Sequence, residues 1–249
     1  MDPCLDVSAN PLHELRAELS RFEERVIRQR DALVLLTSQQ LADCDALPQA
    51  LRSILEVSAA TLSVERASIW KYTNDRTAIE CVDLHESRRR RHSAGFVLRA
   101  ADYPAYFTAL LRADVVAADD ASADPRTCEF AESYLRPHGI QSMLDAPLHL
   151  NGVVDGVICH EHIGAPRQWT ADEKSFVVAV SNVISLAFER CGRQRAESAL
   201  SLQAAALNAA DDAMVIADRA GTLVWVNPAF TRLTGYNASE AIGKNPSSL

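Results

Sequence analysis

Residues 159–162 read Cys-His-Glu-His and bring together side chains that bind metals and move protons. On a strand, His160 and His162 would point to one face, and the cysteine and glutamate to the other. Two histidines on one face bind a metal when a third ligand approaches, and that ligand would be His85 or His92. The four side chains of the run cannot all converge, and a sheet edge hydrogen-bonds histidines easily. We therefore expect structural or pocket-lining roles, with a metal or haem site at His160 and His162 as the weaker alternative.

A basic run at residues 88–91 consists of four arginines and could attract a phosphate or an acidic partner. A run of like charges repels itself and stays in water, so the sequence favours a solvated loop. The acidic residues Asp119, Asp120 and Asp124 fit a turn and helix-cap cluster better than an acid–base pair. No Ser/His/Asp order with a nucleophile elbow is present, so an enzyme is disfavoured.

A third group of residues is aromatic. Tyr103, Tyr106 and Phe107 lie at helical spacing, and Trp70 falls in a strand pattern. Aromatic side chains at such positions most often belong to a core. With a few convergent polar groups, the same side chains also form the wall of a small-molecule pocket. The pattern alone leaves both roles open.

Composition narrows the class of protein. The 249 residues are 48% apolar and 23% charged, which is typical of a folded protein and excludes disorder as the main state. The net charge of −8 and the aromatic content of 6% disfavour a nucleic-acid binder. Residues 176–188 are the most apolar stretch and are too short to span a bilayer, and residues 1–10 lack signal-peptide features. We expect a cytoplasmic protein whose six cysteines are reduced and mostly buried.

The elements that must position these side chains begin with a long helix. Between residues 12 and 36, apolar side chains and one glutamine recur three and four positions apart, on one seam of a helix. A lone helix has no core of its own, so the seam needs a partner. It packs either on the rest of the chain or, as we favour, on the same helix of a second copy. The seam consists of Leu12, Leu15, Leu19, Phe22, Val26, Gln29, Leu33 and Leu36.

The middle of the chain alternates between helices and strands. Asp45 and Asp102 are predicted to cap helices over residues 47–62 and up to residue 111. The intervening pattern predicts strands at residues 66–72, 78–85, 96–98 and 115–118, and a helix over residues 124–135.

The clearest hairpin comes next. Asn151 and Gly152 favour a type I′ turn between strands at residues 142–150 and 153–163. Thr170 and Glu173 then form a capping box at the start of a helix that continues toward residue 202. Together these elements predict an α+β fold, in which an antiparallel sheet has its helices packed on one face.

Residues 45–190 resemble a GAF domain, the small-molecule sensory module of signalling proteins. The matching stretches are LRSILEVSAATL, ASIWKY, DYPAYF, AADDASADPRT, GIQSMLDAPLHLNGVVDGVICHEH and WTADEKSFVVAVSNVISLAFE. Residues 207–249 resemble the start of a PAS domain through AMVIADRAGTLVWVNPAFTRLTGYNASEAIGKNP. The resemblance implies an amphipathic helix at 1–44, a GAF domain at 45–190, a helical linker at 191–206 and an incomplete PAS domain at 207–249.

The resemblance also implies where a ligand would bind, because the pocket of a GAF domain lies between the sheet and the variable middle segment. The candidate pocket residues are Trp70, His85, Arg99, Tyr103, Tyr106, Phe107, Asp119, Asp145 and His160. We expect no cofactor. The Cys159-His160 pair lacks the surrounding phytochrome signature for bilin attachment, and Pro246 stands where flavin-binding PAS domains carry a reactive cysteine. Residues 169–173 match the cyclic-nucleotide motif only weakly.

Such modules regulate cyclic-di-GMP synthases or hydrolases, or histidine kinases, and we favour the cyclic-di-GMP enzymes as output. The expectation is a non-catalytic bacterial sensory fragment, cut inside its PAS domain, with no nucleic-acid or membrane partner. It would signal through a homodimer built from the helices over residues 12–36 and 170–202. The alternatives are a ligand-free dimerisation module and a small thiol or sulfoxide enzyme. A cut PAS sheet predicts that residues 208–249 are loosely held or pair with a neighbouring copy.

Overall fold

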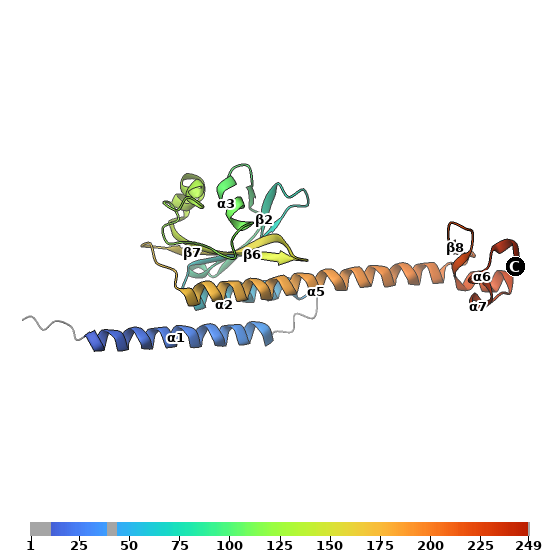
Figure 1. Cartoon of the computed structure of the whole chain (residues 1–249), viewed down its shortest axis with the longest axis horizontal. Helices are drawn as coiled ribbons and strands as arrows, with labels where there is room; N and C mark the ends of the chain where they lie inside the picture. Colours follow the sequence, from blue (N-terminus) through green and yellow to red (C-terminus); the bar gives the residue numbers. More distant parts are fainter. Residues whose placement is uncertain (1–10, 39–43, 249) are drawn as a thin grey trace, which may run out of the picture. The chain divides into compact units, whose positions relative to one another are not determined.

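The computed structural model describes residues 11–38 and 44–248 (Figure 1). It divides into two units, Met1–Cys191 and Gly192–Leu249. The predicted N-terminal helix therefore falls only in part within the described residues, and Cys4 lies outside them.

The first unit is built on an antiparallel sheet, as predicted. Its two long hairpins lie side by side because β1 pairs with β2 on one edge and with β7 on the other. Three short strands complete the sheet, with β3 and β4 pairing with β2, and β5 pairing with β6. The strands are β1 (Arg66–Tyr72), β2 (Ala78–Glu86), β3 (Arg91–Ser93), β4 (Val97–Arg99), β5 (Val116–Ala118), β6 (Ile140–Leu150) and β7 (Val153–Ile163).

The turn between β6 and β7 has the predicted chemistry. Asn151 and Gly152 have φ angles of 51° and 78°, which is the left-handed backbone that a type I′ turn requires at both central positions. This turn fixes the register of the hairpin and so decides which side chains of β6 and β7 share a face.

Helices cover the two faces of the sheet unequally. Figure 1 shows α2 (Leu47–Leu62) and α5 (Ala171–Ala209) along one face, and α3 (Pro104–Leu110) on the other. We call the face covered by α2 and α5 the inner face, and the face covered by α3 the outer face. The inner half of the core joins sheet residues such as Ile69 and Ile158 to Ile184 of α5. The outer half of the core lies under the remaining turns of the middle segment, which are η2 (Cys128–Phe130), η3 (Ala131–Leu135) and α4 (Arg136–His138).

Two predicted helix caps and one predicted helix are wrong. The cap positions are Ala46 for α2 and Tyr103 for α3, not Asp45 and Asp102. Both helices have a proline in their first two positions, which removes one of the amide donors that a cap satisfies. The helix expected over residues 124–135 is replaced by the short 3₁₀, π and α turns from residue 128 onward.

The first helix, α1 (Pro11–Ser38), divides along its length. Gln29, Ala32 and Leu36 are buried, and the Gln29 side-chain amide donates to Asp172 of α5 over 2.9 Å. The seam residues nearer its start are exposed instead: Leu12 by 64%, Leu15 by 62%, Leu19 by 56% and Phe22 by 46%. The C-terminal half of the helix therefore packs on its own chain. The N-terminal half presents an apolar stripe that the single chain leaves exposed.

The cysteines depart from the expectation that all are reduced. Cys44 and Cys191 form a disulfide with 5.0 Å between their Cα atoms. Cys81 and Cys159 are buried free thiols, and Cys128 is exposed. The disulfide partners are 147 residues apart in sequence, so their spacing gave no sign of the pairing.

The second unit continues α5 and then forms a hairpin of β8 (Val215–Ala217) and β9 (Leu223–Val226). Two helices follow, α6 (Pro228–Thr234) and α7 (Ala238–Ala241). Asn227 ties the unit together, since its side chain accepts from the Phe230 amide and donates to the carbonyl of Leu207. Only a small core forms, of Leu223, Val226, Phe230 and Ala241.

By length and composition, α5 is the one helix in the described ranges that could cross a membrane. Its apolar residues Phe176, Val180 and Ile184 are buried in the inner half of the core. That burial is typical of the core helix of a water-soluble domain.

Candidate ligand-binding site

A cavity of about 250 Å³ opens on the outer face, between the first hairpin and the η3–α4 turns. Trp70, Phe96, Leu98 and Tyr134 supply its apolar and aromatic walls. Its charged lining consists of Arg66, Glu86, Arg89 and Arg91. Three guanidinium groups thus face one carboxylate around a partly aromatic hollow.

The register of the sheet places a row of charges beside this cavity. Arg66 of β1 pairs with Glu86 of β2 on one side and with Glu161 of β7 on the other. Directly paired residues of neighbouring strands project to the same face. The Arg66 Nε lies 2.6 Å from Glu161 Oε2, and its Nη1 lies 3.7 Å from Glu86 Oε1. Tyr134 completes the group by accepting from Arg66 over 3.1 Å and donating to Glu161 over 2.8 Å.

These contacts fix the charges of the row. Burial is the largest single influence and lowers the pKa of Arg66, but the charges of and hydrogen bonds to Glu161 and Tyr134 together outweigh it and raise that pKa above its usual value. Burial and the same carboxylate raise the pKa of Tyr134. The site therefore presents a permanent guanidinium and a neutral phenol across the physiological pH range.

The mouth of the cavity is formed by the arginine run. Arg90 has a φ of 45°, and this left-handed residue turns the chain from η1 (Ser87–Arg89) into β3. Arg91 Nε donates to Glu86 over 3.0 Å, and Arg89 lies 3.4 Å from the same carboxylate. Burial would raise the pKa of Glu86, but the hydrogen bond from Arg91 and the nearby guanidinium charges lower it overall. The run is solvent-exposed, as predicted, but two of its members also line the cavity.

The structure brings some of the sequence-predicted residues near this cavity. Trp70 lines it directly. Tyr106 and Phe107 are buried in the adjoining outer half of the core. Tyr103 stacks on Phe130 with ring centroids 4.2 Å apart, and its hydroxyl lies 3.1 Å from Ser133 Oγ.

Other predicted pocket residues lie elsewhere. His85 and His160 both pair with Ala67, and Ala67 belongs to the inner half of the core, so both imidazoles are on the inner face. Arg99 is exposed on β4. Asp119 accepts a hydrogen bond from the Trp169 amide over 3.0 Å and so anchors the chain before α5. The two histidines lie away from the cavity because of the register in which the strands pair, and this register could not be read from the sequence.

The two weaker metal candidates, His160 and His162, contact different partners. His160 Nδ1 lies 3.3 Å from the Leu144 carbonyl oxygen, whereas His162 Nδ1 lies 3.0 Å from Glu65. The group of metal-ligating side chains that residues 11–38 and 44–248 do form contains neither histidine.

Asp145 lies on the outer face, but in a filled part of the core. Its Oδ2 accepts from the Tyr106 hydroxyl over 2.7 Å, and that hydroxyl lies 3.6 Å from Cys159 Sγ. Burial raises the pKa of Asp145 to about 8 and the pKa of Cys159 above its usual value. The hollow that Tyr106 and Cys159 help to line has a volume of only about 10 Å³, which is room for a single water at most. A protonated, enclosed thiol is a poor nucleophile.

Sequence reasoning missed Arg66, Glu86 and Tyr134 of the cavity lining, and the partner that Glu161 provides beside it. One signal was available, because Glu161 belongs to the Cys-His-Glu-His run and must point away from its neighbouring histidines. Its partner Arg66 lies 95 residues earlier in the chain, and only the pairing of β1 with β7 joins them.

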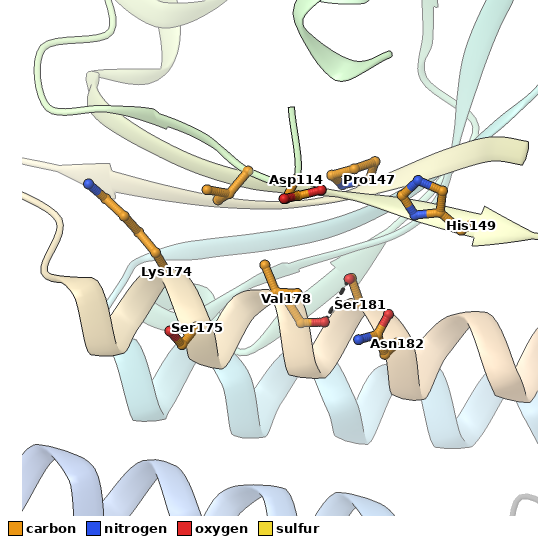
Figure 2. Close-up of a pocket in the computed structure, with 9 residues that line it drawn as sticks. Asp114, Pro147, His149, Lys174, Ser175, Val178, Ser181 and Asn182 are labelled. Atoms are coloured by element: carbon orange, nitrogen blue, oxygen red, sulfur yellow. Dashed lines mark hydrogen bonds between the residues drawn. The ribbon is translucent and has the colours of Figure 1, made fainter. Parts of the chain in front are cut away.

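A second, larger hollow of about 450 Å³ lies where β6 meets α5. Figure 2 shows Asp114, Pro147 and His149 on one side and α5 residues, including Lys174, on the other. The hydrogen bond drawn there runs from Ser181 Oγ to the Val178 carbonyl, within the helix itself. We place the candidate site in the outer-face cavity, because there the charged groups come from several elements and converge on one hollow.

Comparisons with known proteins agree with this architecture. The solved structures most similar to the chain include the phycoerythrobilin-bound GAF domain of a cyanobacterial phytochrome (17% identity, TM-score 0.56, covering 67% of this chain and 97% of that one). They also include the GAF domain of an Acinetobacter phosphoenolpyruvate-protein phosphotransferase (16%, 0.53, 70% and 95%). A third is residues 122 to 287 of a methyl-accepting chemotaxis protein (21%, 0.51, 65% and 98%). At these identities the likeness concerns the fold.

The search of curated proteins found no significant match. Two family profiles match the sequence: the PAS fold over residues 202–249 and the GAF domain over residues 46–188. The second match spans more than half of the chain and contains the whole sheet with its cavity. The chain therefore belongs to the GAF domain family.

Proposed function

We propose that this chain is a non-catalytic sensory module whose outer-face cavity binds a small anionic molecule. The observation that carries the proposal is the excess of guanidinium groups around the cavity. Arg66, Arg89 and Arg91 line it, and Glu86 is the one carboxylate among its lining residues within the described part of the chain. Guanidinium groups bind carboxylates and phosphates through paired hydrogen bonds.

The size and walls of the cavity narrow the ligand. Its volume of about 250 Å³ is near the lower end of small-molecule sites, which span roughly 300–1,000 Å³. Trp70 and Tyr134 offer apolar ring surface beside the charged groups. The fit is to a small metabolite with one carboxylate or phosphate and a short apolar part, bound without a cofactor.

Signalling would use the helices at the two ends of the GAF domain. In this proposal α1 pairs with its copy through the exposed stripe that begins at Leu12, and α5 carries the change toward the PAS segment. A ligand acts on such a bundle only if it favours one helix arrangement over another. The output served is proposed to be a cyclic-di-GMP synthase or hydrolase rather than a histidine kinase, in the cytoplasm.

The test compares two neighbouring arginines. Small mono- and dicarboxylates and phosphate monoesters are screened by thermal shift, since a ligand that binds the folded state raises its Tm. The affinity of each binder is then measured by calorimetry for wild type, Arg91→Ala and Arg88→Ala. Arg91 lines the cavity, whereas Arg88 is 71% exposed and pairs with Glu65. Loss of a hydrogen bond to a charged group predicts about 10- to 100-fold weaker binding for Arg91→Ala. Arg88→Ala should bind the same compound as tightly as wild type.

Equal affinity in the two variants would contradict the cavity as the site. If none of the compounds raises the Tm, the result favours the second candidate function. In that case the chain is a ligand-free GAF module that acts only in dimerisation. The specific observation that favours this second candidate is the filled centre of the outer core around Tyr106 and Cys159, with its hollow of about 10 Å³.

A further inference from the structure

Three side chains on the inner side of the sheet form a cluster that the proposed ligand site does not use. Glu56 comes from α2, His85 from β2 and His92 from β3. One ligand atom from each lies within 4.8 Å of those of the other two. The two histidines are directly paired across the strands, so the antiparallel register of β2 and β3 holds both imidazoles toward the same helix.

The proton positions in this cluster leave several lone pairs facing one another. His92 Nδ1 lies 3.1 Å from both carboxylate oxygens of Asp83. Because an ionised carboxylate only accepts, that nitrogen carries the proton, and Nε2 of a neutral His92 is then an acceptor. His92 Nε2 lies 3.2 Å from Glu56 Oε1 and 3.1 Å from His85 Nδ1. When His85 carries its proton on Nε2, its Nδ1 lone pair, the Nε2 lone pair of His92 and the Glu56 carboxylate face one another, and a cation bound by all three would satisfy them.

Two of the three separations are already close to those of a metal site, and the third, between Glu56 and His85, is within 4.8 Å. Ligands about 2.0–2.2 Å from a tetrahedral Zn²⁺ ion are roughly 3.3–3.5 Å apart. The two shortest separations here are 3.1 and 3.2 Å, so they need to open by only a few tenths of an ångström. Asp83 supplies the usual outer partner of a metal-binding histidine, a carboxylate that accepts from the other ring nitrogen.

Charge and access agree with a cation. Glu56 and Asp83 contribute two negative charges, and Arg52 offsets one, since its Nε lies 3.4 Å from Asp83. The Glu56 side chain is 57% exposed, and His92 lines a cavity of about 320 Å³. An ion can therefore enter from solvent without unfolding the domain.

We propose that Glu56, His85 and His92 bind one Zn²⁺ ion, with Asp83 orienting His92 and a water as the fourth ligand. The site joins α2 to the edge of the sheet formed by β2 and β3. It is independent of the outer-face cavity and of what that cavity binds, because its three ligands lie on the opposite face.

The test uses the full chain, treated with a chelator, dialysed, and titrated with Zn²⁺ by calorimetry. A parallel titration with Co²⁺ reads the ligand geometry from its visible absorption bands. We expect one ion per chain. Asp83→Asn should weaken binding by about 10- to 100-fold, and His85→Ala, His92→Ala and Glu56→Gln by at least as much.

The matched control is His149→Ala, which removes an exposed histidine of β6 and should bind as tightly as wild type. Glu56→Gln keeps the test decisive if a histidine variant fails to fold, because Glu56 is mostly exposed. Circular dichroism checks the fold of each variant. Absence of saturable Zn²⁺ uptake by wild type, or unchanged affinity in folded Glu56→Gln and His92→Ala, would overturn the assignment.

Discussion

The phenol oxygen of Tyr106 lies 2.7 Å from Oδ2 of Asp145, inside the outer half of the core. Both side chains are buried, Asp145 fully and Tyr106 with 1% of its surface exposed. Burial raises the pKa of Asp145 to about 8 and also raises the pKa of Tyr106. At neutral pH the folded protein therefore holds a proton on a carboxyl that the unfolded chain releases.

This proton makes the free energy of unfolding depend on pH. Between about pH 4 and pH 8 the folded state binds the Asp145 proton and the unfolded state does not. Stability from this group therefore falls as pH rises, by up to about 1.4 kcal/mol per pH unit. His160 has the opposite effect below about pH 6.5, so the fall should be visible between about pH 6.5 and pH 8, and in Asp145→Asn chemical denaturation over that range should no longer show it. Tyr106→Phe, the control, should lower stability while the fall persists. An unchanged pH profile in Asp145→Asn would contradict the assignment.

His160 predicts the opposite dependence. Burial lowers its pKa to about 4 from the ordinary 6.5, so between these values the unfolded state binds a proton that the folded state excludes. Stability from this group is lost as pH falls from about 6.5 to about 4, again by up to about 1.4 kcal/mol per pH unit. Because Asp145 offsets this loss in the wild type, it is measured in the Asp145→Asn variant, where adding His160→Asn, which keeps a donor for the Leu144 carbonyl, should remove it. The exposed control His149→Asn should leave the acid limb of the stability curve as in wild type.

Asp145 and His160 show what an alternating strand pattern can and cannot predict about side-chain positions. Their alternation along β6 and β7 was readable in the sequence, and so was the hairpin that joins the strands. Which face each occupies was not readable, because a shift of one residue reverses every side chain. Both residues were pocket candidates, and the pairing of the strands places Asp145 on the outer face and His160 on the inner face. The pairing with Ala67, a long-range contact, decided the matter.

The charged row of the candidate site could not be predicted from the sequence either, because it also depends on how distant strands pair. Arg66 and Glu161 are 95 residues apart, and no local pattern links them. By contrast, the hairpins and the α1 seam rest on local periodicity and turn chemistry, which depend on residues close together in the sequence. The cap at Asp45 failed because Pro48 in the first turn already lacks an amide donor.

Breaking the Arg66–Glu161 pair should be strongly destabilising. The two side chains are 6% and 2% exposed, so Glu161→Leu leaves a buried guanidinium whose charge is only partly compensated, by Glu86 at 3.7 Å. We expect a loss of about 3–5 kcal/mol in the free energy of unfolding, measured by urea denaturation. Adding Arg66→Met to Glu161→Leu should recover much of it, because the uncompensated charge is then gone. The exposed pair of Arg136 and Glu132 is the control, and Arg136→Ala should change stability by less than about 1 kcal/mol.

The Cys44–Cys191 disulfide should make stability depend on redox conditions. It ties the segment before α2 to the end of the GAF domain across 147 residues. Without reductant, Cys191→Ser should lower the free energy of unfolding by about 2–5 kcal/mol, and with reductant it should differ little from wild type. Cys128→Ser, which removes an exposed free thiol, should behave as wild type in both. Peptide mass spectrometry without reduction should recover the cross-linked pair; finding both cysteines as free thiols would contradict it.

The exposed seam of α1 predicts the oligomeric state. Leu15 and Leu19 are 62% and 56% exposed within the single chain, whereas Leu36 at the other end of the helix is fully buried. A helix whose own chain covers only one end of its apolar seam gains most by pairing the other end with a second copy, since burial of apolar surface contributes about 25 cal/mol per Å². Sedimentation should find wild type dimeric, Leu15→Asp with Leu19→Asp monomeric, and Ser20→Asp, off the seam, still dimeric. A wild type that stays monomeric at high concentration would mean that α1 does not pair, and the coupling through α1 and α5 would fail with it.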